Sequence, residues 1–250
     1  MRSVAANAVF FAVTAKPRHT HETNPVAFAP TSTDAVAMET RLPRRAGRDF
    51  VARHGETVFN AARRLQGDLP HTPLTRAGFA QADEMGRALL IALGQRPALT
   101  LWCSPTGRAL QTIAVIAEHL ALDWHQVRTD ARLTEIGMGA WGGRYYADVV
   151  DEVGPVIDAR GLLRCAPDGE RYEAIAERVS GWLADTADDD GDRLVVMHGI
   201  SSRVLRGVMT GAPVDSCGAP VLDGLPQGSV VRIEGGREAV IHRGTGGAPA

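Results

Sequence analysis

Cysteine is scarce in this chain of 250 residues, and long apolar runs are absent. The three cysteines, Cys103, Cys165 and Cys217, are odd in number and widely spaced, so they form neither a zinc-binding pattern nor a disulfide framework. This usage is typical of a reducing compartment, and we predict a cytoplasmic protein. No apolar run approaches the length of a membrane span, so we expect no membrane partner.

Lysine is almost missing as well, because Lys16 is the only one and the other cationic side chains are arginines. The formal net charge is only -2, which gives no reason to expect nucleic acid or an anionic membrane as a partner. Apolar residues make up 44% and charged residues 22% of the chain, as in ordinary globular proteins. The length suffices for one domain with a sizeable core.

Residues 1–47 are rich in Pro, Thr, Ala and Asn and lack any sustained helical or strand period. We predict that they form a low-order extension without catalytic residues, ahead of a single domain at 48–245. Two other interpretations stay open. The stretch that ends at Val13-Thr14-Ala15 faintly resembles a secretory signal, and Met38 would serve as a start much closer to the domain.

Strand-like and helix-like segments alternate through the rest of the chain. We predict strands at 50–52, 98–102, 127–129 and 193–197, and a closing hairpin from 229–233 and 239–242. We predict helices from the N-cap Thr75 to about Leu93, from the N-cap Ser104 to Leu120, from 170 to 184 and from 200 to 209. Such alternation is typical of an α/β protein, here a three-layer α/β/α sandwich around a mostly parallel sheet. The irregular segment 140–167 is predicted to be a cap or specificity insertion.

One apolar run ends at Arg53-His54-Gly55, just before a segment that can start a helix. Strand ends in α/β proteins deliver side chains to a crevice, and helix N-termini there offer free N–H groups to anions. Arg53 can hold phosphoryl oxygens in a fork, and the neutral imidazole of His54 can act as a nucleophile. Gly55 would let the backbone pass close to a ligand. By itself an Arg-His pair is more often structural, so the prediction depends on further motifs.

Further motifs follow in order along the chain. They are Asn60 with Gln66-Gly67, Pro73-Leu74-Thr75, the segment 104–112 with Arg108 inside it, Leu133-Thr134-Glu135, and the segment 195–199 with His198 inside it. In this order and spacing they resemble the histidine phosphatase superfamily (phosphoglycerate-mutase-like), phosphatase branch. The resemblance covers about residues 49–233, and several separated motifs in one order make it specific.

The resemblance implies a phosphomonoesterase that hydrolyses a small phosphorylated metabolite through a phosphohistidine on His54. Arg53 and Arg108 would clamp the phosphoryl oxygens, and His198 would complete the cradle. Glu135 would act as the general acid and then as the base that activates water. The two arginines should lower the pKa of His54 and so keep it neutral. Further substrate contacts are expected from Asn60, Gln66, Gly67 and Gly199. We expect no cofactor.

Other functions stay open at this point. A cofactor-dependent phosphoglycerate mutase would use the same residues, but relatives with that activity typically carry a basic insertion, whereas residues 148–152 are acidic here. A non-catalytic phospho-ligand binding domain would keep the fold without turnover. A metal site from His54, Glu56 and His198 matches no helical ligand spacing and would meet repulsion from the arginines, so we expect no metal. The expected partner is a small phosphoester, and we expect neither nucleic acid nor a membrane as a partner. A homodimer is one possible assembly.

Overall fold

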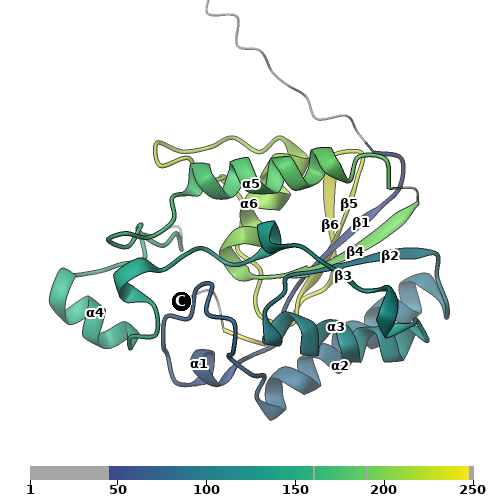
Figure 1. Ribbon diagram of the computed structural model, residues 1–250, viewed down its shortest axis with the longest axis horizontal. Helices are drawn as coiled ribbons and strands as arrows, with labels where there is room; N and C mark the ends of the chain where they lie inside the picture. Colours follow the sequence, from purple (N-terminus) through teal and green to yellow (C-terminus); the bar gives the residue numbers. More distant parts are fainter. Residues whose placement is uncertain (1–44, 160, 190, 248–250) are drawn as a thin grey trace, which may run out of the picture. The chain divides into compact units, whose positions relative to one another are not determined.

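The structure, a computed structural model, describes residues 45–159, 161–189 and 191–247. Within these ranges six strands form a sheet in the order β3-β2-β4-β1-β5-β6 (Figure 1). The strands are β1 (Asp49–Arg53), β2 (Leu99–Cys103), β3 (Arg128–Thr129), β4 (Asp192–Met197), β5 (Val230–Glu234) and β6 (Arg237–His242). Strands β1 to β4 run parallel to one another, and the antiparallel strands β5 and β6 complete the sheet beside β1.

Helices cover both faces of this sheet. Figure 1 shows α2 (Arg76–Leu93) and α3 (Gly107–Leu120) on one face and α5 (Tyr172–Asp185) and α6 (Gly199–Thr210) on the other. The helices α1 (Val58–Ala61) and α4 (Tyr146–Val153) lie outside these layers, as do the short 3-10 turns at Trp124–Gln126, Ala131–Leu133 and Gly139–Trp141. The predicted three-layer α/β/α sandwich with a mostly parallel sheet is therefore confirmed.

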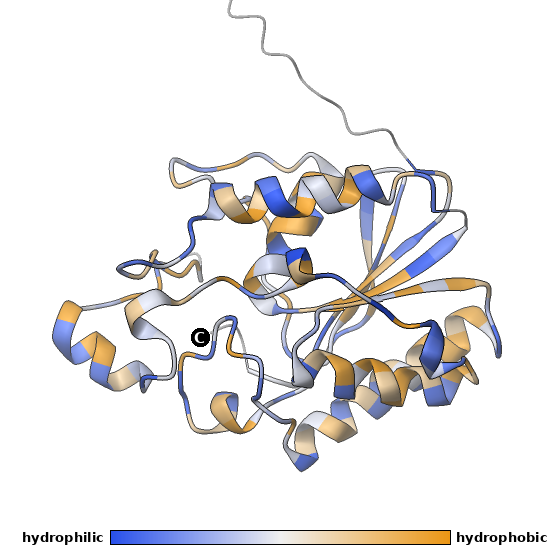
Figure 2. Ribbon diagram, in the orientation of Figure 1, coloured by the Kyte–Doolittle hydropathy of each residue, from blue (hydrophilic) through white to orange (hydrophobic). Residues whose placement is uncertain are grey.

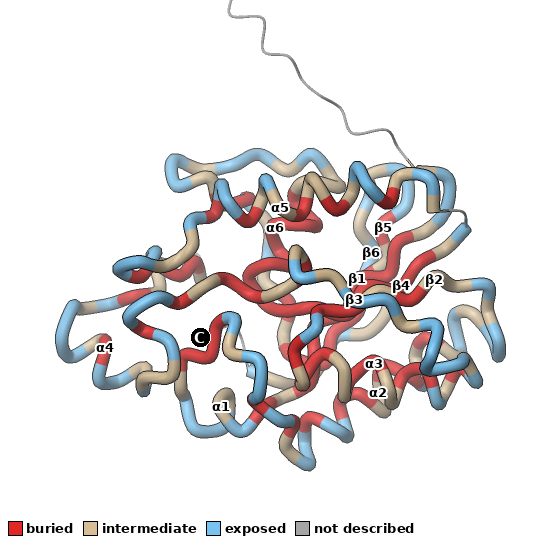
Figure 3. The backbone as a smooth tube through the Cα atoms, in the orientation of Figure 1, coloured by how far each residue is buried: buried red, intermediate tan, exposed pale blue. Residues whose placement is uncertain are grey.

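Side-chain alternation along the central strands builds two separate cores. Phe50 and Ala52 of β1 belong to the core under α2 and α3, whereas Val51 between them belongs to the core on the opposite face. In β4, Leu194 belongs to the core under α2 and α3, and Val195 belongs to the core on the opposite face. Because successive strand residues point to opposite faces, an unbroken apolar run fills both cores. Apolar residues gather along the central strands β1 and β4 in Figure 2, and Figure 3 shows these two strands as mostly buried.

Helix α2 begins and ends where the sequence indicates. The hydroxyl of Thr75 accepts a hydrogen bond from the backbone N–H of Gly78 at 3.0 Å, which makes Thr75 the N-cap. Gly94 ends the helix with a φ of 77°, a conformation that glycine adopts without a steric penalty. Met85 and Leu89 are fully buried on its inner face. The predicted bounds of this helix are confirmed.

Helix α3 begins later than predicted. Its N-cap is Thr106 and its first helical residue is Gly107, so the predicted N-cap Ser104 is wrong. Ser104 does not cap the helix because its hydroxyl is hydrogen-bonded to Nε2 of His198 at 2.8 Å. The same hydroxyl also accepts from the backbone N–H of Thr106 at 3.5 Å, so Ser104 belongs to the turn before α3 and to the contact with His198.

Strand β2 also differs from its prediction. It covers 99–103 instead of 98–102, and only Leu101 and Cys103 are buried along it. The incomplete burial of β2 follows from its place in the sheet, because its outer neighbour β3 is only two residues long and covers little of it. The helices predicted at 170–184 and 200–209 and the closing hairpin are observed with small shifts of their ends.

The predicted extension 1–47 lies mostly outside the described residues, as do the possible signal and the possible start at Met38. Residues 45–47 are described, and they contact the domain. Arg45 donates a hydrogen bond to the carbonyl of Gly191 at 2.7 Å and pairs with Asp49 at 3.2 Å. A Cβ on Gly47 would lie 2.1 Å from that same carbonyl oxygen, so this approach requires glycine. In the described ranges no helix has the length and apolar character needed to cross a membrane.

The α2–α3 core yields a stability prediction. Ile113 on α3 has no exposed surface, whereas Ile91 on α2 is 87% exposed. Ile113→Ala should lower the free energy of unfolding by about 2–5 kcal/mol because it leaves a cavity. Ile91→Ala should change it by about 0.5 kcal/mol or less. Urea unfolding followed by circular dichroism measures both, and equal effects would show that this core is not packed as described.

Candidate active site

The ends of two neighbouring parallel strands bring His54 and His198 together. Each histidine directly follows the last residue of its strand, and these last residues, Arg53 of β1 and Met197 of β4, are register partners. The two imidazole rings meet edge to face with their centroids 5.2 Å apart. Both side chains are buried, with 1% and 0% of their surface exposed. The two histidines therefore lie together, as the sequence predicts.

The hydrogen bonds of His54 define its tautomer. Its Nδ1 lies 2.7 Å from the carbonyl oxygen of Gly55, which can only accept, so we assign the ring proton to Nδ1. The Nε2 atom then carries a free lone pair. Burial lowers the pKa of His54 well below its ordinary value, and the charges of Arg108 and Arg53 lower it further. The two arginines thus lower the pKa of His54 as expected, but burial is the larger reason why His54 is neutral.

His198 has the opposite tautomer. The Nε–H of Arg108 donates to Nδ1 of His198 at 3.1 Å, so the proton of this ring is on Nε2 and is donated to the hydroxyl of Ser104. Burial, followed by the charge of Arg108, lowers the pKa of His198 well below its ordinary value. Two neutral imidazoles with fixed ring orientations thus lie side by side.

Arg108 connects His198 to the loop at 67–72. Its Nη1 donates to the carbonyl of Leu69 at 2.7 Å and to the hydroxyl of Thr72 at 2.9 Å, and its Nη2 donates to the carbonyl of Gly67 at 2.6 Å. Together with the bond to His198, these contacts use all but one N–H of the guanidinium. The side chain is fully buried. Arg108 therefore fixes the geometry of the site and keeps only one donor for a ligand.

Arg53 is the guanidinium with more donors available. Its Nη1 donates to the carbonyl of Leu225 at 2.5 Å, while its buried Nε has no hydrogen-bond partner among the described residues. A Cβ on Gly199 would lie 3.1 Å from the central guanidinium carbon, so glycine there makes room for Arg53. Burial lowers the pKa of Arg53 to about 10, against the opposing charge of Glu135, and burial likewise lowers the pKa of Arg108 to about 10. Both arginines stay charged at neutral pH.

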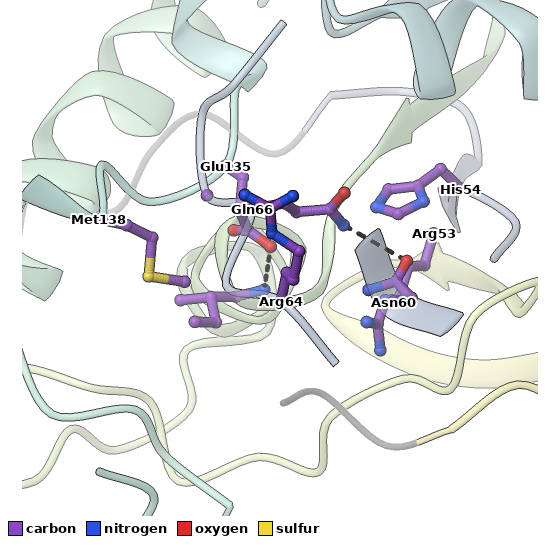
Figure 4. Close-up of a pocket in the computed structure, with 9 residues that line it drawn as sticks. Arg53, His54, Asn60, Arg64, Gln66, Glu135 and Met138 are labelled. Carbon is purple, nitrogen blue, oxygen red and sulfur yellow. Dashed lines mark hydrogen bonds between the residues drawn. The ribbon is translucent and has the colours of Figure 1, made fainter. Parts of the chain in front are cut away.

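Glu135 occupies the N-terminus of α6. Its carboxylate accepts backbone hydrogen bonds from Ile136 at 3.0 Å, Ile200 at 3.0 Å and Ser201 at 2.8 Å. Free N–H groups at a helix N-terminus attract anions, and here the anion is a side chain of the protein itself. Figure 4 shows Glu135 in the same pocket as His54, reached from the opposite side. A carboxyl group therefore faces the imidazole across the pocket.

Asn60 and Gln66 form one hydrogen-bonded unit with Thr57. The Oδ1 of Asn60 accepts from the backbone N–H of Thr57 at 3.1 Å and from Nε2 of Gln66 at 3.3 Å. The Oε1 of Gln66 accepts from the hydroxyl of Thr57 at 2.9 Å. Asn60 thus closes the capping box of α1 and also lines the pocket, to which its amide NH₂ can donate.

A small pocket collects most of the predicted site residues (Figure 4). It is lined by Arg53, His54, Asn60, Arg64, Gln66, Gly67, Glu135, Met138 and Ile200. Of the predicted residues, Arg108, His198 and Gly199 are not part of this lining and support it from behind through the contacts above. Among the described residues of the predicted insertion 140–167, none belongs to the lining.

Arg64, Met138 and Ile200 are the lining residues that the sequence did not single out. A signal for Arg64 existed, because it lies two residues before Gln66 and extended chain points such residues to the same side. Leu65 between them is buried, as this alternation requires. The two apolar residues carried no comparable signal.

The structure gives a reason for Gly55 that the sequence did not predict, and the predicted approach of a ligand stays a prediction. A Cβ at this position would lie 2.2 Å from the carbonyl oxygen of Gly78, and a Cβ on Gly78 would lie 2.0 Å from the carbonyl oxygen of Glu56. Both glycines are therefore required by the close backbone contact between the end of β1 and the start of α2.

The chemistry of this arrangement is that of phosphoryl transfer. A neutral imidazole with a free lone pair can act as a nucleophile, guanidiniums can stabilise an anionic phosphoryl group, and a carboxyl group can exchange a proton. Among the described residues there is no group of three or more His, Cys, Asp or Glu side chains that could hold a metal ion.

Comparison with known proteins defines the family. The sequence profile of the histidine phosphatase superfamily (branch 1) matches residues 50–243, which is most of the chain. The chain belongs to the histidine phosphatase superfamily. The predicted family and the predicted class of enzyme, a histidine phosphatase, are confirmed.

Individual relatives agree with this assignment. The probable phosphoglycerate mutase GpmB of Citrobacter koseri is 33% identical over 175 residues, covering 66% of this chain and 75% of that protein. A mycobacterial glucosyl-3-phosphoglycerate phosphatase in complex with VO3 superposes with a TM-score of 0.66 at 25% identity, covering 81% of this chain and 100% of that one. A putative alpha-ribazole-5'-P phosphatase from Escherichia coli gives a TM-score of 0.62 at 23% identity, covering 82% and 100%, and shows the shared fold alone.

The buried neutral histidines predict a pH-dependent stability. Because the folded-state pKa values of His54 and His198 lie below the ordinary 6.5, the unfolded chain binds protons below that pH that the folded chain does not. The stability that these two neutral histidines contribute is complete above pH 6.5 and is lost as the pH falls below it. In that range the free energy of unfolding falls by up to about 1.4 kcal/mol per pH unit for each histidine. His54→Gln should flatten this slope, as measured by urea unfolding at several pH values.

Exposed His125 provides the matched control for this experiment. His125→Gln should leave the slope of the wild-type protein as it is. Equal slopes for the wild-type protein and for His54→Gln would contradict the neutral state assigned to His54.

Proposed function

We propose that this chain is a phosphomonoesterase that hydrolyses a small phosphorylated metabolite through a phosphohistidine on His54. The observation that supports this most is the state of His54: its Nδ1 proton is engaged by Gly55, so the lone pair of Nε2 is free. Arg53 and Glu135 line the same pocket. A nucleophile, a cation and a proton donor are the minimum that the reaction needs.

In the first step Nε2 of His54 attacks phosphorus, and the N–P bond forms as the bond from phosphorus to the leaving oxygen breaks. Arg53 donates to the equatorial oxygens, where negative charge accumulates. Arg108 adds its positive charge and its one remaining N–H. Glu135 delivers a proton to the leaving oxygen, so the product departs as an alcohol. Asn60 and the segment at Gln66-Gly67 add neutral contacts to the substrate.

In the second step Glu135, now a carboxylate, accepts a proton from water while the water oxygen attacks phosphorus. The N–P bond breaks, inorganic phosphate leaves, and His54 returns to its neutral form. The three backbone N–H groups around Glu135 suit the ionised carboxylate of this step. His198, oriented by Arg108 and Ser104, packs against His54 in both steps.

Two rival functions use the same fold. The GpmB relatives are named probable phosphoglycerate mutases, and a mutase has to retain a substrate with two phosphate groups. In this chain Arg144 of the predicted insertion is paired with Glu152 at 2.7 Å, and Asp148 and Asp151 add negative charge beside it. Because Arg144 is already paired and the described residues of 140–167 do not line the pocket, this segment offers no evident site for a second phosphate, which favours hydrolysis. A non-catalytic binding domain is disfavoured because each proposed catalytic residue is present.

The setting of the enzyme is part of the proposal. A cytoplasmic location is supported by the free cysteines Cys103, Cys165 and Cys217. A small phosphoester as the only partner fits the small pocket and the net charge of -2. The homodimer and the lack of a nucleic-acid partner stay predictions.

Replacement of the nucleophile gives the direct test of function. His54→Ala should lower phosphate release by about 10³-fold or more, because no other group forms the N–P bond. It should retain phosphate binding, since both arginines stay in place. Released phosphate is measured over a panel of phosphorylated metabolites and p-nitrophenyl phosphate with EDTA present, and His125→Ala is the control with full activity.

The same assay separates the rival functions. With 3-phosphoglycerate and catalytic 2,3-bisphosphoglycerate, we expect free phosphate and no 2-phosphoglycerate. Formation of the isomer would identify a mutase. Failure of the unmodified protein to hydrolyse any member of the panel would support the binding domain and reject the enzyme.

A further inference from the structure

Arg64 is a cation of the pocket that the phosphoryl chemistry above does not use. It lines the pocket together with His54 and Glu135 (Figure 4). The nucleophile, the phosphoryl contacts and the proton transfer are all provided by other residues. The inference drawn from Arg64 rests on the proposed phosphatase function and concerns the leaving group of its substrate.

The structure holds Arg64 in a fixed orientation. Its backbone forms an antiparallel bridge with Tyr145, and its Nε donates to the carbonyl of Gly143 at 2.7 Å, a carbonyl that its Nη2 also contacts. The guanidinium carbon lies 4.3 Å from the ring centroid of Phe59 and 5.2 Å from that of Tyr145. Such stacking orients a guanidinium before any ligand binds. Within the described chain, the two N–H groups of Nη1 and one of Nη2 have no acceptor, so they can bind a ligand.

Arg64 also differs from Arg144 and Arg178 in its charge environment. Arg144 pairs with Glu152 and Arg178 pairs with Glu170, each at 2.7 Å. No carboxylate among the residues that the structure describes lies within 4.0 Å of the guanidinium of Arg64. An oriented and uncompensated cation in a pocket indicates an anion in the ligand.

The charge and the free donors of Arg64 show which anion fits. Both N–H groups of Nη1 and one of Nη2 have no acceptor within the described chain, so Arg64 can donate two parallel hydrogen bonds to a planar group with two oxygens. A carboxylate has this shape, and its single negative charge balances the single positive charge of Arg64. A second phosphate dianion would carry twice that charge.

The position of Arg64 indicates which part of the substrate carries this charge. In the view of Figure 4 its guanidinium lies on the Glu135 side of the pocket, away from the imidazole of His54. Since Glu135 protonates the leaving oxygen, this side of the pocket faces the leaving group. Met138 and Ile200 supply the apolar part of the lining. We propose that Arg64 is a specificity residue that binds a carboxylate on the leaving group of the substrate.

Two phosphate esters that differ only in this group provide the test. 3-Phosphoglycerate carries a carboxylate where glycerol 3-phosphate carries a hydroxymethyl group. The measured quantity is the ratio of kcat/KM for 3-phosphoglycerate to kcat/KM for glycerol 3-phosphate. Where turnover of either ester is too slow, the reciprocal of the inhibition constant against p-nitrophenyl phosphate replaces kcat/KM for both esters. The wild-type ratio should exceed one, and Arg64→Gln should lower it about tenfold, the effect of one charge-assisted contact.

Arg63 provides a matched control, because it is an adjacent arginine with an exposed side chain outside the pocket lining. Arg63→Gln should leave the ratio unchanged. Arg64→Lys keeps the positive charge and loses the paired N–H donors of the guanidinium, so it should give an intermediate ratio. This partial effect would show that the result for Arg64→Gln is not a folding defect. An unchanged ratio in Arg64→Gln, or a wild-type ratio of one or less, overturns the proposal. Loss of all hydrolysis in the wild-type protein would instead reject the phosphatase function itself.

Discussion

The site depends on one buried guanidinium, that of Arg108. From the first turn of α3 it reaches His198, Leu69, Thr72 and Gly67 with no surface exposed. Burial of a cation is costly unless its donors are satisfied, and here hydrogen bonds to neutral acceptors provide this. These bonds fix the loop that carries Gly67, set the tautomer of His198, and place a positive charge that lowers the pKa of His54. The nucleophile is therefore kept neutral first by its own burial and then by the charge of Arg108.

The parallel pairing of β1 and β4 provides the second constraint. Their register places the two histidines beside each other, and the helix that follows β4 presents its N–H groups to Glu135. The strand ends and the helix N-terminus thus position the nucleophile His54 and the proton donor Glu135 on opposite sides of one pocket. Because these elements belong to the two cores, the catalytic geometry is fixed by the packing of the sheet and its helices.

Much of this could be predicted from the sequence, because it depends on local patterns and on the order of motifs. The alternation of segments indicates the layers, and the histidines that end two apolar runs indicate the site. Contacts between distant segments could not be predicted. Ser104 is a good capping residue by its local sequence, yet its hydroxyl contacts His198. Gly55 serves a backbone contact with Gly78, and Arg64 is oriented by Gly143, on a segment far along the chain.

Direct detection of the covalent intermediate tests the central claim, that the free Nε2 of His54 is the nucleophile. The protein is mixed with p-nitrophenyl phosphate, quenched in base within milliseconds to preserve phosphohistidine, digested and analysed by mass spectrometry. The account predicts one phosphoryl group on the peptide that contains His54, and none in His54→Ala. Phosphorylation of a different residue, or rapid turnover with no phosphorylated peptide at any quench time, would contradict it.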